Sequence, residues 1–430
     1  MRTSVAVIVV VMLTAAFGAD PARAMCGCML RPRPDVKKGE TLGAKIVNKS
    51  SKVILARDGD TTSMTLANDF VGAPAHFGLV VPVPTVIHKE DVKVVGDEVF
   101  DRLERATAPT VTEVFDDDDC ARPSSAGAGM LRTESVAPAA APKASRAADY
   151  GVKVESHFFA GEYEIAVLSG TNANGLIAWL QKFDYDVPDD AKEVLQSYIK
   201  QKMMFFLARV YVKEMGTGPR HLRPIQVRYQ TPKLMLPIRL GMVNADGAQE
   251  LLVFALTSRG RVDTTNYRTV KMPTGAKLPY FAKDAWTEVY GAMFDEQEKR
   301  EDKRVLFIEA QDRLAVDDSV KKAGAFWQSG QAFVTRLHFR YASDQFPEDL
   351  QLQSTDDAST FRVRMEAIKP AQSPCNVPAA NRRRDQERQA IANLTGWSME
   401  TVLQKAGLPL DSETPPGKPH EDKWYERLWK

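Results

Sequence analysis

Residues 52–67 read KVILARDGDTTSMTLA, and this stretch points to the fold class. Two strand-like runs, 52–57 and 61–67, flank Asp58-Gly59-Asp60. Asp-Gly between such runs is the strongest short signal for a β-hairpin. A calcium loop beginning at Asp58 fits poorly, because such a loop needs Gly at its sixth position and Glu at its twelfth, where this chain has Ser63 and Asp69. The stretch therefore predicts antiparallel β-structure.

Outside this hairpin, strand-like runs alternate with helical patterns. Apolar and β-branched residues predict strands over 203–212, 225–230, 234–240, 250–257, 306–310 and 333–341. Helical spacing and start signals predict helices over 175–183, from 190 to about 201, over 284–294 and over 381–406. The predicted fold class is α+β, with mainly antiparallel β-strands, several amphipathic helices and a helical C-terminal region.

Pro82 and Pro84 lie two residues apart in the apolar run 77–87. In a strand, both would lack an N–H along the same edge, so that edge cannot form a complete ladder of hydrogen bonds. We therefore expect an edge strand or a polyproline-like segment here.

Composition divides the chain into five parts. Residues 121–148 contain 19 Ala, Pro, Ser or Gly among 28 residues, which predicts a disordered linker. The expected parts are a signal peptide (1–24), a β-rich region (25–120), the linker (121–148), an α+β domain (149–370) and a helical C-terminal region with a tail (371–430). Whether the regions that flank the linker form one domain or two stays open at this point.

The first 24 residues have the pattern of a secretory signal. A basic start precedes an apolar run of thirteen residues from Val5 to Phe17, and small residues at 22 and 24 place the expected cleavage after Ala24. The apolar run is too short to span a bilayer, and we expect no transmembrane span after cleavage. Cleavage would leave 55 basic and 55 acidic residues, a balance that argues against nucleic-acid binding. The predicted location is exported: periplasm, outer envelope or extracellular.

Export sets the redox context of the four cysteines, Cys26, Cys28, Cys120 and Cys375. In an oxidising compartment they predict two disulfides. A Cys26–Cys28 bridge would close a strained ring around one glycine. Both other pairings remain open, with Cys26 and Cys28 joined separately to Cys120 and Cys375.

A different hypothesis for the same stretch is a soft-metal site. Met25, Cys26, Cys28 and Met29 offer thioether and thiolate ligands that suit Cu(I). Paired cysteines are the more usual state in an exported chain, so we hold copper handling as a second alternative.

Local motifs of common enzyme classes are absent from the sequence. It contains no Gly-x-Ser-x-Gly, His-Glu-x-x-His, Cys-x-x-Cys, phosphate loop or dinucleotide fingerprint, and we expect no cofactor. A hydrolase site assembled from distant groups stays an alternative, with the six histidines at 76, 88, 157, 221, 338 and 420 as candidates. Glu155 and His157, like Glu162 and Glu164, alternate as on the solvated face of a sheet. Whether the protein is an enzyme is uncertain, and the sequence favours a non-enzymatic role.

The C-terminal residues 423–430 read KWYERLWK. One helical turn would place Trp424, Tyr425 and Trp429 on an aromatic face beside basic residues. We expect this face either to dock on the protein's own surface or to contact a membrane surface or an envelope protein.

Several stretches resemble a family of exported bacterial proteins known as domain of unknown function 2330. They are residues 53–70, 76–84, 225–241, 243–256, 265–273 and 392–400. The resemblance implies an envelope or secreted protein and assigns no catalytic residue. It also implies a short cysteine-rich insert in relatives where this chain reads AQDRLAVDD (310–318). Together, these observations predict an exported binding or scaffold protein of the bacterial envelope.

Overall fold

Residues 52–67 form the predicted hairpin. Strands β2 (Val47–Asp58) and β3 (Thr61–Val71) pair antiparallel, with Asp58 opposite Thr61. Gly59 in the loop has φ +52°, a left-handed conformation that glycine adopts without steric cost. The structure, a computed structural model, describes residues 27–33, 47–71, 76–116, 150–211, 222–243, 247–324, 330–372, 374 and 376–408.

The hairpin lies inside the largest sheet of the described chain, which has nine strands. Their order is β14 (Arg268–Lys271), β16 (Val305–Ala315), β17 (Gln331–Tyr341), β12 (Gln249–Thr257), β2, β3, β10 (Ile225–Gln230) and β5 (Val92–Val94), with β19 (Phe361–Arg362) paired to β16. Most neighbours are antiparallel, whereas β2 with β12 and β14 with β16 are parallel. The α+β class with mostly antiparallel strands is therefore confirmed.

A second sheet of five strands has the order β1 (Cys28–Leu30), β4 (His76–Val83), β9 (Met204–Tyr211), β8 (Tyr163–Gly170) and β7 (Val152–Ala160). A small third sheet joins β11 (Leu234–Leu236), β18 (Leu350–Ser354) and β13 (Val262–Thr264). Strands from before and after residues 121–148 share both large sheets. The two flanking regions are therefore interleaved, which answers the question that the sequence left open.

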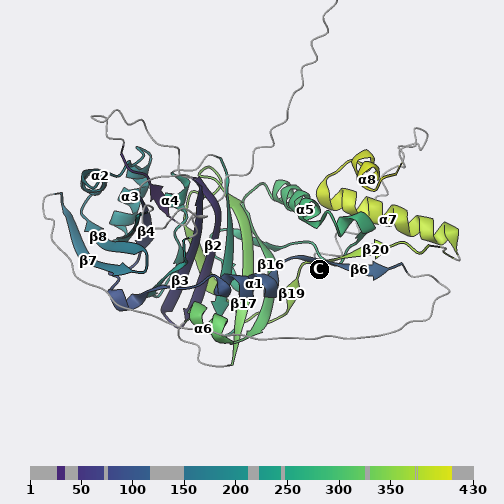
Figure 1. The fold of residues 1–430 in the computed structure, drawn as a ribbon, viewed down its shortest axis with the longest axis horizontal. Helices are drawn as coiled ribbons and strands as arrows, with labels where there is room; N and C mark the ends of the chain where they lie inside the picture. The colour runs from purple at the N-terminus through teal and green to yellow at the C-terminus, as the bar shows by residue number, and fades with distance from the viewer. Residues whose placement is uncertain are drawn as a thin grey trace, which may run out of the picture.

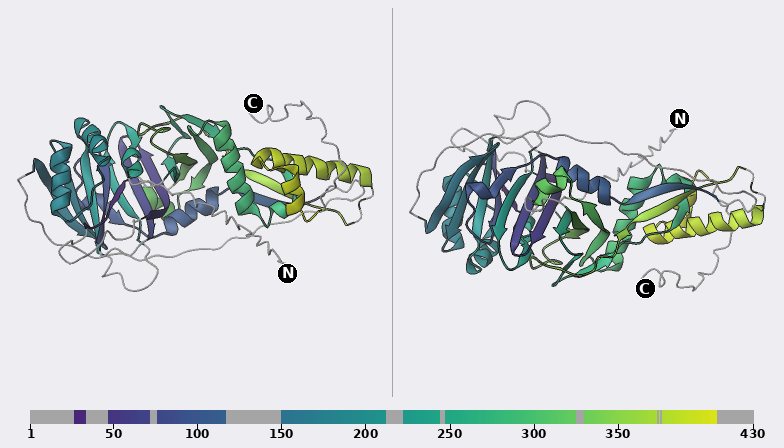
Figure 2. Two further views of the ribbon diagram at one scale, coloured as in Figure 1. Left: turned by 90° about the horizontal axis from the view of Figure 1, so that it is seen from above. Right: turned by 90° about the horizontal axis from the view of Figure 1, so that it is seen from below.

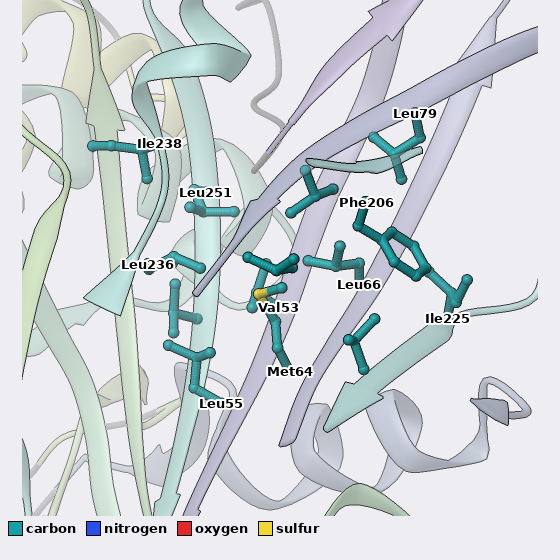
Figure 3. Packing of buried hydrophobic residues seen from close by; sticks show 14 of the residues in the cluster. Val53, Leu55, Met64, Leu66, Leu79, Phe206, Ile225, Leu236, Ile238 and Leu251 are labelled. Atoms are coloured by element: carbon teal, nitrogen blue, oxygen red, sulfur yellow. The ribbon is translucent and has the colours of Figure 1, made fainter. Parts of the chain in front are cut away.

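The main core lies between the two large sheets. One hydrophobic cluster contains residues of both sheets (Figure 3). The nine-stranded sheet contributes Val53 and Leu55 of β2 and Leu66 of β3, and the five-stranded sheet contributes Leu79 of β4 and Phe206 of β9. Because strand side chains alternate between faces, residues next in sequence to these belong to other clusters. Ile54 and Ala56, for example, pack on the opposite face of the nine-stranded sheet.

Helices cover the outer faces of both sheets. On the five-stranded sheet lie α2 (Ala173–Lys182) and α3 (Ala191–Lys200), and on the nine-stranded sheet lie α1 (Glu98–Thr107) and α6 (Asp318–Gly324). Short helical turns connect other strands: η2 (Lys89–Asp91), α4 (Arg239–Met242) and η4 (Tyr280–Ala282). The result is a layered sandwich whose central strands are largely buried on both faces.

A smaller unit extends from one end of this sandwich (Figures 1 and 2). Its sheet has the order β15 (Lys277–Pro279), β20 (Arg364–Lys369) and β6 (Thr110–Phe115), with parallel neighbours. It packs with α5 (Trp286–Arg300), α7 (Val377–Thr395) and α8 (Met399–Lys405), and its core joins the sandwich through Val305 and Phe307 of β16. We call it the end unit.

Two details differ from the sequence predictions. Strand β4 is not an edge strand, because β1 pairs with Gly78–Val80 on one side and β9 pairs along its length on the other. Pro82 lies beyond the residues that β1 reaches, so its missing N–H removes no bond to β1. The predicted strand 234–240 ends at Leu236, before Pro237, and helix α4 follows.

Candidate functional site

Of the candidate metal and disulfide residues, Cys28 and Met29 lie in the described part of the chain, in β1. Cys28 is 2% exposed and packs in the cluster beneath α2 and α3, whereas Met29 is 4% exposed and packs between the two sheets. Successive strand residues point to opposite faces, so these two side chains do not meet at one site. The close approach of β4 explains why a glycine lies between the two cysteines, because a Cβ at Gly27 would lie 2.6 Å from the Val80 carbonyl oxygen.

The other metal and disulfide candidates, the cleavage point and the aromatic residues of the tail lie outside the described residues. They are Ala24 at the cleavage point, Met25, Cys26, Cys120, Cys375, and the aromatic residues Trp424, Tyr425 and Trp429. Of the helices that the structure describes, none combines the length and hydropathy that a membrane crossing requires.

The acidic residues of β7, of β8 and of the turn between these strands are engaged in local contacts. Glu155 accepts a hydrogen bond from Ser169 at 2.6 Å, and Glu162 pairs with Arg223 at 2.7 Å. The Nε2 atom of His157 lies 2.9 Å from Glu164, and its Nδ1 atom is buried without a partner. A buried Nδ1 offers no face to a substrate. In the described residues, no three His, Cys, Asp or Glu side chains gather as metal ligands would.

Strand β17 contributes a row of charged side chains to a buried surface. Leu337 and Phe339 face the main core, so Arg336, His338 and Arg340 face the opposite side, where α1 and α5 lie. All three side chains are at most 19% exposed. We call this group and its partners the ion network.

Glu309 lies at the centre of the ion network and is fully buried. It occupies a β-bulge of β16, where the register with β17 shifts between Ile308 and Ala310. Its carboxylate accepts hydrogen bonds from the Tyr290 hydroxyl, from Arg336 Nε at 2.5 Å and from His338 Nδ1 at 2.5 Å.

The network continues from both ends of this centre. His338 Nε2 lies 3.0 Å from Glu250, which also accepts a hydrogen bond from Arg340 at 3.1 Å. Arg336 pairs with Glu104 of α1 at 2.7 Å, and Glu104 pairs with Lys52 at 2.8 Å. Arg340 donates to Asp295 and Glu298 of α5. The chain of alternating charges thus ties both helices to the sheet.

The charges of the network fix its protonation. Burial opposes ionisation of Glu309, but the charges of His338 and Arg336 outweigh it and lower the pKa of Glu309 to about 2. Burial likewise disfavours the charged His338 ring, but Glu309 and Glu250 raise the pKa of His338 to about 9. At neutral pH, His338 is therefore an imidazolium whose two N–H groups both donate to carboxylates. In this state the ring has no lone pair for general-base catalysis.

The end unit contains an open groove of about 590 Å³ between α7 and its sheet. The lining is mostly apolar. Its walls include Ala276, Ile368, the aliphatic parts of α7 and Phe115, whose side chain is 70% exposed at the end of β6. A volume in this range suits a small-molecule site. We call it the α7 groove.

Two acidic residues of the α7 groove differ in their partners. The side chain of Asp116 is 3% exposed and accepts a hydrogen bond from Arg383 Nε at 2.7 Å. Glu387 is 7% exposed, and no described residue donates a hydrogen bond to its carboxyl or forms an ion pair with it. Burial and the nearby charge of Asp116 raise the pKa of Glu387 to about 7.

Neither Glu387 nor Glu309 is among the site residues predicted from the sequence. A signal for Glu387 exists, because residues 380, 387, 391 and 394 follow helical spacing and the other three are Ala, Ile and Leu. A carboxyl residue in an apolar stripe is unusual. Glu309 has no comparable signal, since its burial depends on a bulge and on contacts with distant elements.

Comparisons with known proteins bear on the family. Among solved structures, baculovirus P35 aligns at 12% identity over 72% of this chain and 98% of its own, with a TM-score of 0.31. A mutated baculovirus P35 after caspase cleavage aligns at 10% identity over 71% of this chain and 99% of its own, also with a TM-score of 0.31. These scores are too low to support an argument about fold or function.

No curated protein matches the chain. The family model described as an uncharacterized protein conserved in bacteria, DUF2330, matches residues 20–353, a range that ends before β20 and α7. Since that match covers most of the sequence, the chain belongs to this bacterial family.

Proposed function

We propose that this protein is an exported binding protein of the bacterial envelope and that the α7 groove is its ligand site. The observation that carries the proposal is the contrast between the groove and the ion network. In the network, the buried charges are paired with one another. The groove is open and mostly apolar, and it is lined by Glu387, a mostly buried acid whose carboxyl has no hydrogen-bond or ion-pair partner among the described residues.

The chemistry of the groove lining favours binding over catalysis. Its aromatic and charged members are Phe115, Asp116, Lys277, Arg383 and Glu387, and no His, Ser, Thr or Cys is among the described residues of the lining. Nucleophilic catalysis needs a nucleophile beside a base. A pocket with apolar walls and a few polar groups is typical of recognition.

Export is supported by the sequence of residues 1–24, with its basic start, apolar run and small residues before the expected cleavage after Ala24. The test is fractionation of the full chain expressed in bacteria, followed by intact mass measurement. We expect protein outside the cytoplasm with a mass that begins at Met25. Cytoplasmic protein that retains residues 1–24 would contradict export.

Binding is tested by native mass spectrometry on protein from the envelope fraction. We expect a small-molecule adduct on the unaltered chain. Ala390 lines the groove, so Ala390→Trp should fill it and abolish the adduct. Arg382→Trp on an exposed position of α7 is the matched control and should retain the adduct. The absence of any adduct, together with no thermal shift in a fragment screen, would contradict the binding role.

A further inference from the structure

The α7 groove contains a buried acid in a position that packing alone does not explain. Glu387 is more than nine-tenths buried and lies on the apolar stripe of α7, where Ala380 and Ile391 pack against the end unit. A carboxylate in such surroundings is costly to ionise unless a cation or several hydrogen-bond donors face it. Among the described residues, no donor hydrogen-bonds to this carboxyl and no cation forms an ion pair with it, and Glu387 lines the open groove.

The other charged groups of the groove lining are already engaged. Asp116 accepts a hydrogen bond from Arg383, and Lys277 also has an interaction of its own. The Glu387 carboxyl is therefore the charged group of the described lining that remains to be neutralised. A ligand that brings a positive charge would complete the site.

Groups on every neighbouring element act on this carboxyl. Asp116 after β6 disfavours its negative charge, whereas Arg384 and Arg388 of α7 and Lys277 of β15 favour it. Arg388 pairs with the exposed Asp385 at 2.9 Å, and Arg384 contacts Asn381 at 3.4 Å. The balance leaves the pKa of Glu387 at about 7, so the acid is about half ionised at neutral pH.

The rest of the groove determines the shape of the ligand. Its apolar walls, including Phe115, Ile368 and Ala390, suit a hydrocarbon or aromatic body, and about 590 Å³ holds a molecule of small-ligand size. Building on the binding role proposed above, we propose that the α7 groove binds a small molecule with an apolar body and one ammonium group, and that the Glu387 carboxylate receives the ammonium.

The test uses three probes that share a body and differ in their polar group: 4-phenylbutylamine, 4-phenylbutanol and 4-phenylbutyrate. Titration calorimetry on the full chain should show at least tenfold tighter binding of the amine at pH 8. Because the carboxyl must be ionised, affinity for the amine should fall about tenfold between pH 8 and pH 6, following the pKa of about 7. Binding of the alcohol should not follow this dependence.

Variants separate the carboxyl from general effects. Glu387→Gln should lose at least tenfold in affinity for the amine, lose the pH dependence and keep the affinity for the alcohol. Retained alcohol binding also shows that the variant is folded. Asp385→Asn removes an exposed carboxylate from the same helix and should leave amine binding unchanged.

Three results would overturn the proposal. If the three probes bound equally and Ala390→Trp abolished all of them, the groove would be a binding site without preference for a cation. If no probe bound and no native adduct existed, the binding function itself would also be wrong. If replacing Trp424 and Trp429 by Ala raised amine affinity tenfold, the chain's own tail would be the occupant and the small-molecule proposal would fail.

Discussion

Glu309 and His338 lie on adjacent strands, and the Nδ1 atom of the imidazole lies 2.5 Å from the fully buried carboxylate. The contact exists because the bulge in β16 adds a residue at Glu309, whose side chain then reaches the charged face of β17. His338 is also stacked on Phe294 of α5, with ring centroids 4.2 Å apart. This acid–base pair of the sandwich therefore contacts the end unit through Phe294 and Tyr290 of α5.

Glu309→Gln should destabilise the fold strongly. The change leaves the Arg336 and His338 cations buried without the central carboxylate, and loss of one partner of a buried ion pair costs about 3–5 kcal/mol. Chemical denaturation should show that loss in the free energy of unfolding. Asp318→Asn, which breaks the exposed pair with Lys321, is the control and should change it by less than about 1 kcal/mol. Equal effects of the two changes would show that the ion network is not a major source of stability.

Stability should fall at alkaline pH because of His338. Its pKa in the folded protein is about 9, above the ordinary value of 6.5, so protonation stabilises the folded state. The stabilisation is complete below pH 6.5 and is lost as the pH rises through about 9, with a total of about 3 kcal/mol. Unfolding free energies from pH 6 to 10 should show this decline in the unaltered chain.

In His338→Gln, the contribution of this group to the decline should disappear. The exposed His88 provides the control, and His88→Gln should keep the alkaline decline of the unaltered chain. A His338→Gln curve with the same slope as the unaltered chain would show that another group causes the decline.

Stability at acid pH should depend on the ionised carboxylates of the same ion network. The pKa of Glu250 is lowered to about 2, because the His338 and Arg340 contacts outweigh burial. Ionisation of Glu250 therefore stabilises the folded state fully above pH 4.5 and loses this effect as the pH falls through about 2. Glu250→Gln should lower stability at pH 6 and make the acid side of the curve flatter. Unchanged stability at pH 6 would contradict the role of Glu250.

The sequence predicted the helices and strands better than it predicted the ion network around Glu309. The hairpin at Asp58-Gly59-Asp60 follows from local turn chemistry, and the strand at 333–341 follows from its β-branched and aromatic residues. Alternation of Arg336, His338 and Arg340 with apolar residues resembles a half-exposed strand. Here helices α1 and α5 cover the charged face, and the covering depends on elements far away in the chain.

The partners of these charges also come from separate elements. Glu104, Glu250 and Tyr290 lie in α1, β12 and α5, and no spacing in the sequence connects them. Glu387 is different, because its place on the stripe of α7 can be read from helical periodicity alone. Buried polar residues are thus predictable where one helix supplies the apolar stripe and not where several elements converge.

Two glycines provide a matched test of backbone conformation. Both Gly59 and Gly291 have space for a methyl group, but only Gly59 of this pair has a positive φ, at +52°. Gly59→Ala should therefore lower stability by about 1 kcal/mol through strain in the hairpin loop. Gly291→Ala, within α5, should raise stability by about 0.5–1 kcal/mol through helix propensity. Thermal denaturation would show opposite shifts, and equal signs would contradict the conformational explanation.

The disulfide prediction can be decided by non-reducing peptide mapping of protein from its own compartment. Cys28 is buried in β1 opposite Val80, so a bridge at this residue would fasten the start of the mature chain to the five-stranded sheet. We expect Cys26 and Cys28 to be joined separately to Cys120 and Cys375. Closing a loop of roughly 90 residues, as Cys28–Cys120 would, stabilises by about 4–5 kcal/mol in the chain-entropy model. Cys120→Ser and Cys375→Ser should each lower stability by a few kcal/mol, and added reductant should cost these variants less than the unaltered chain. A Cys26–Cys28 ring, or four thiols open to alkylation in the folded protein, would reject the bridges and favour metal or redox chemistry at the N-terminus.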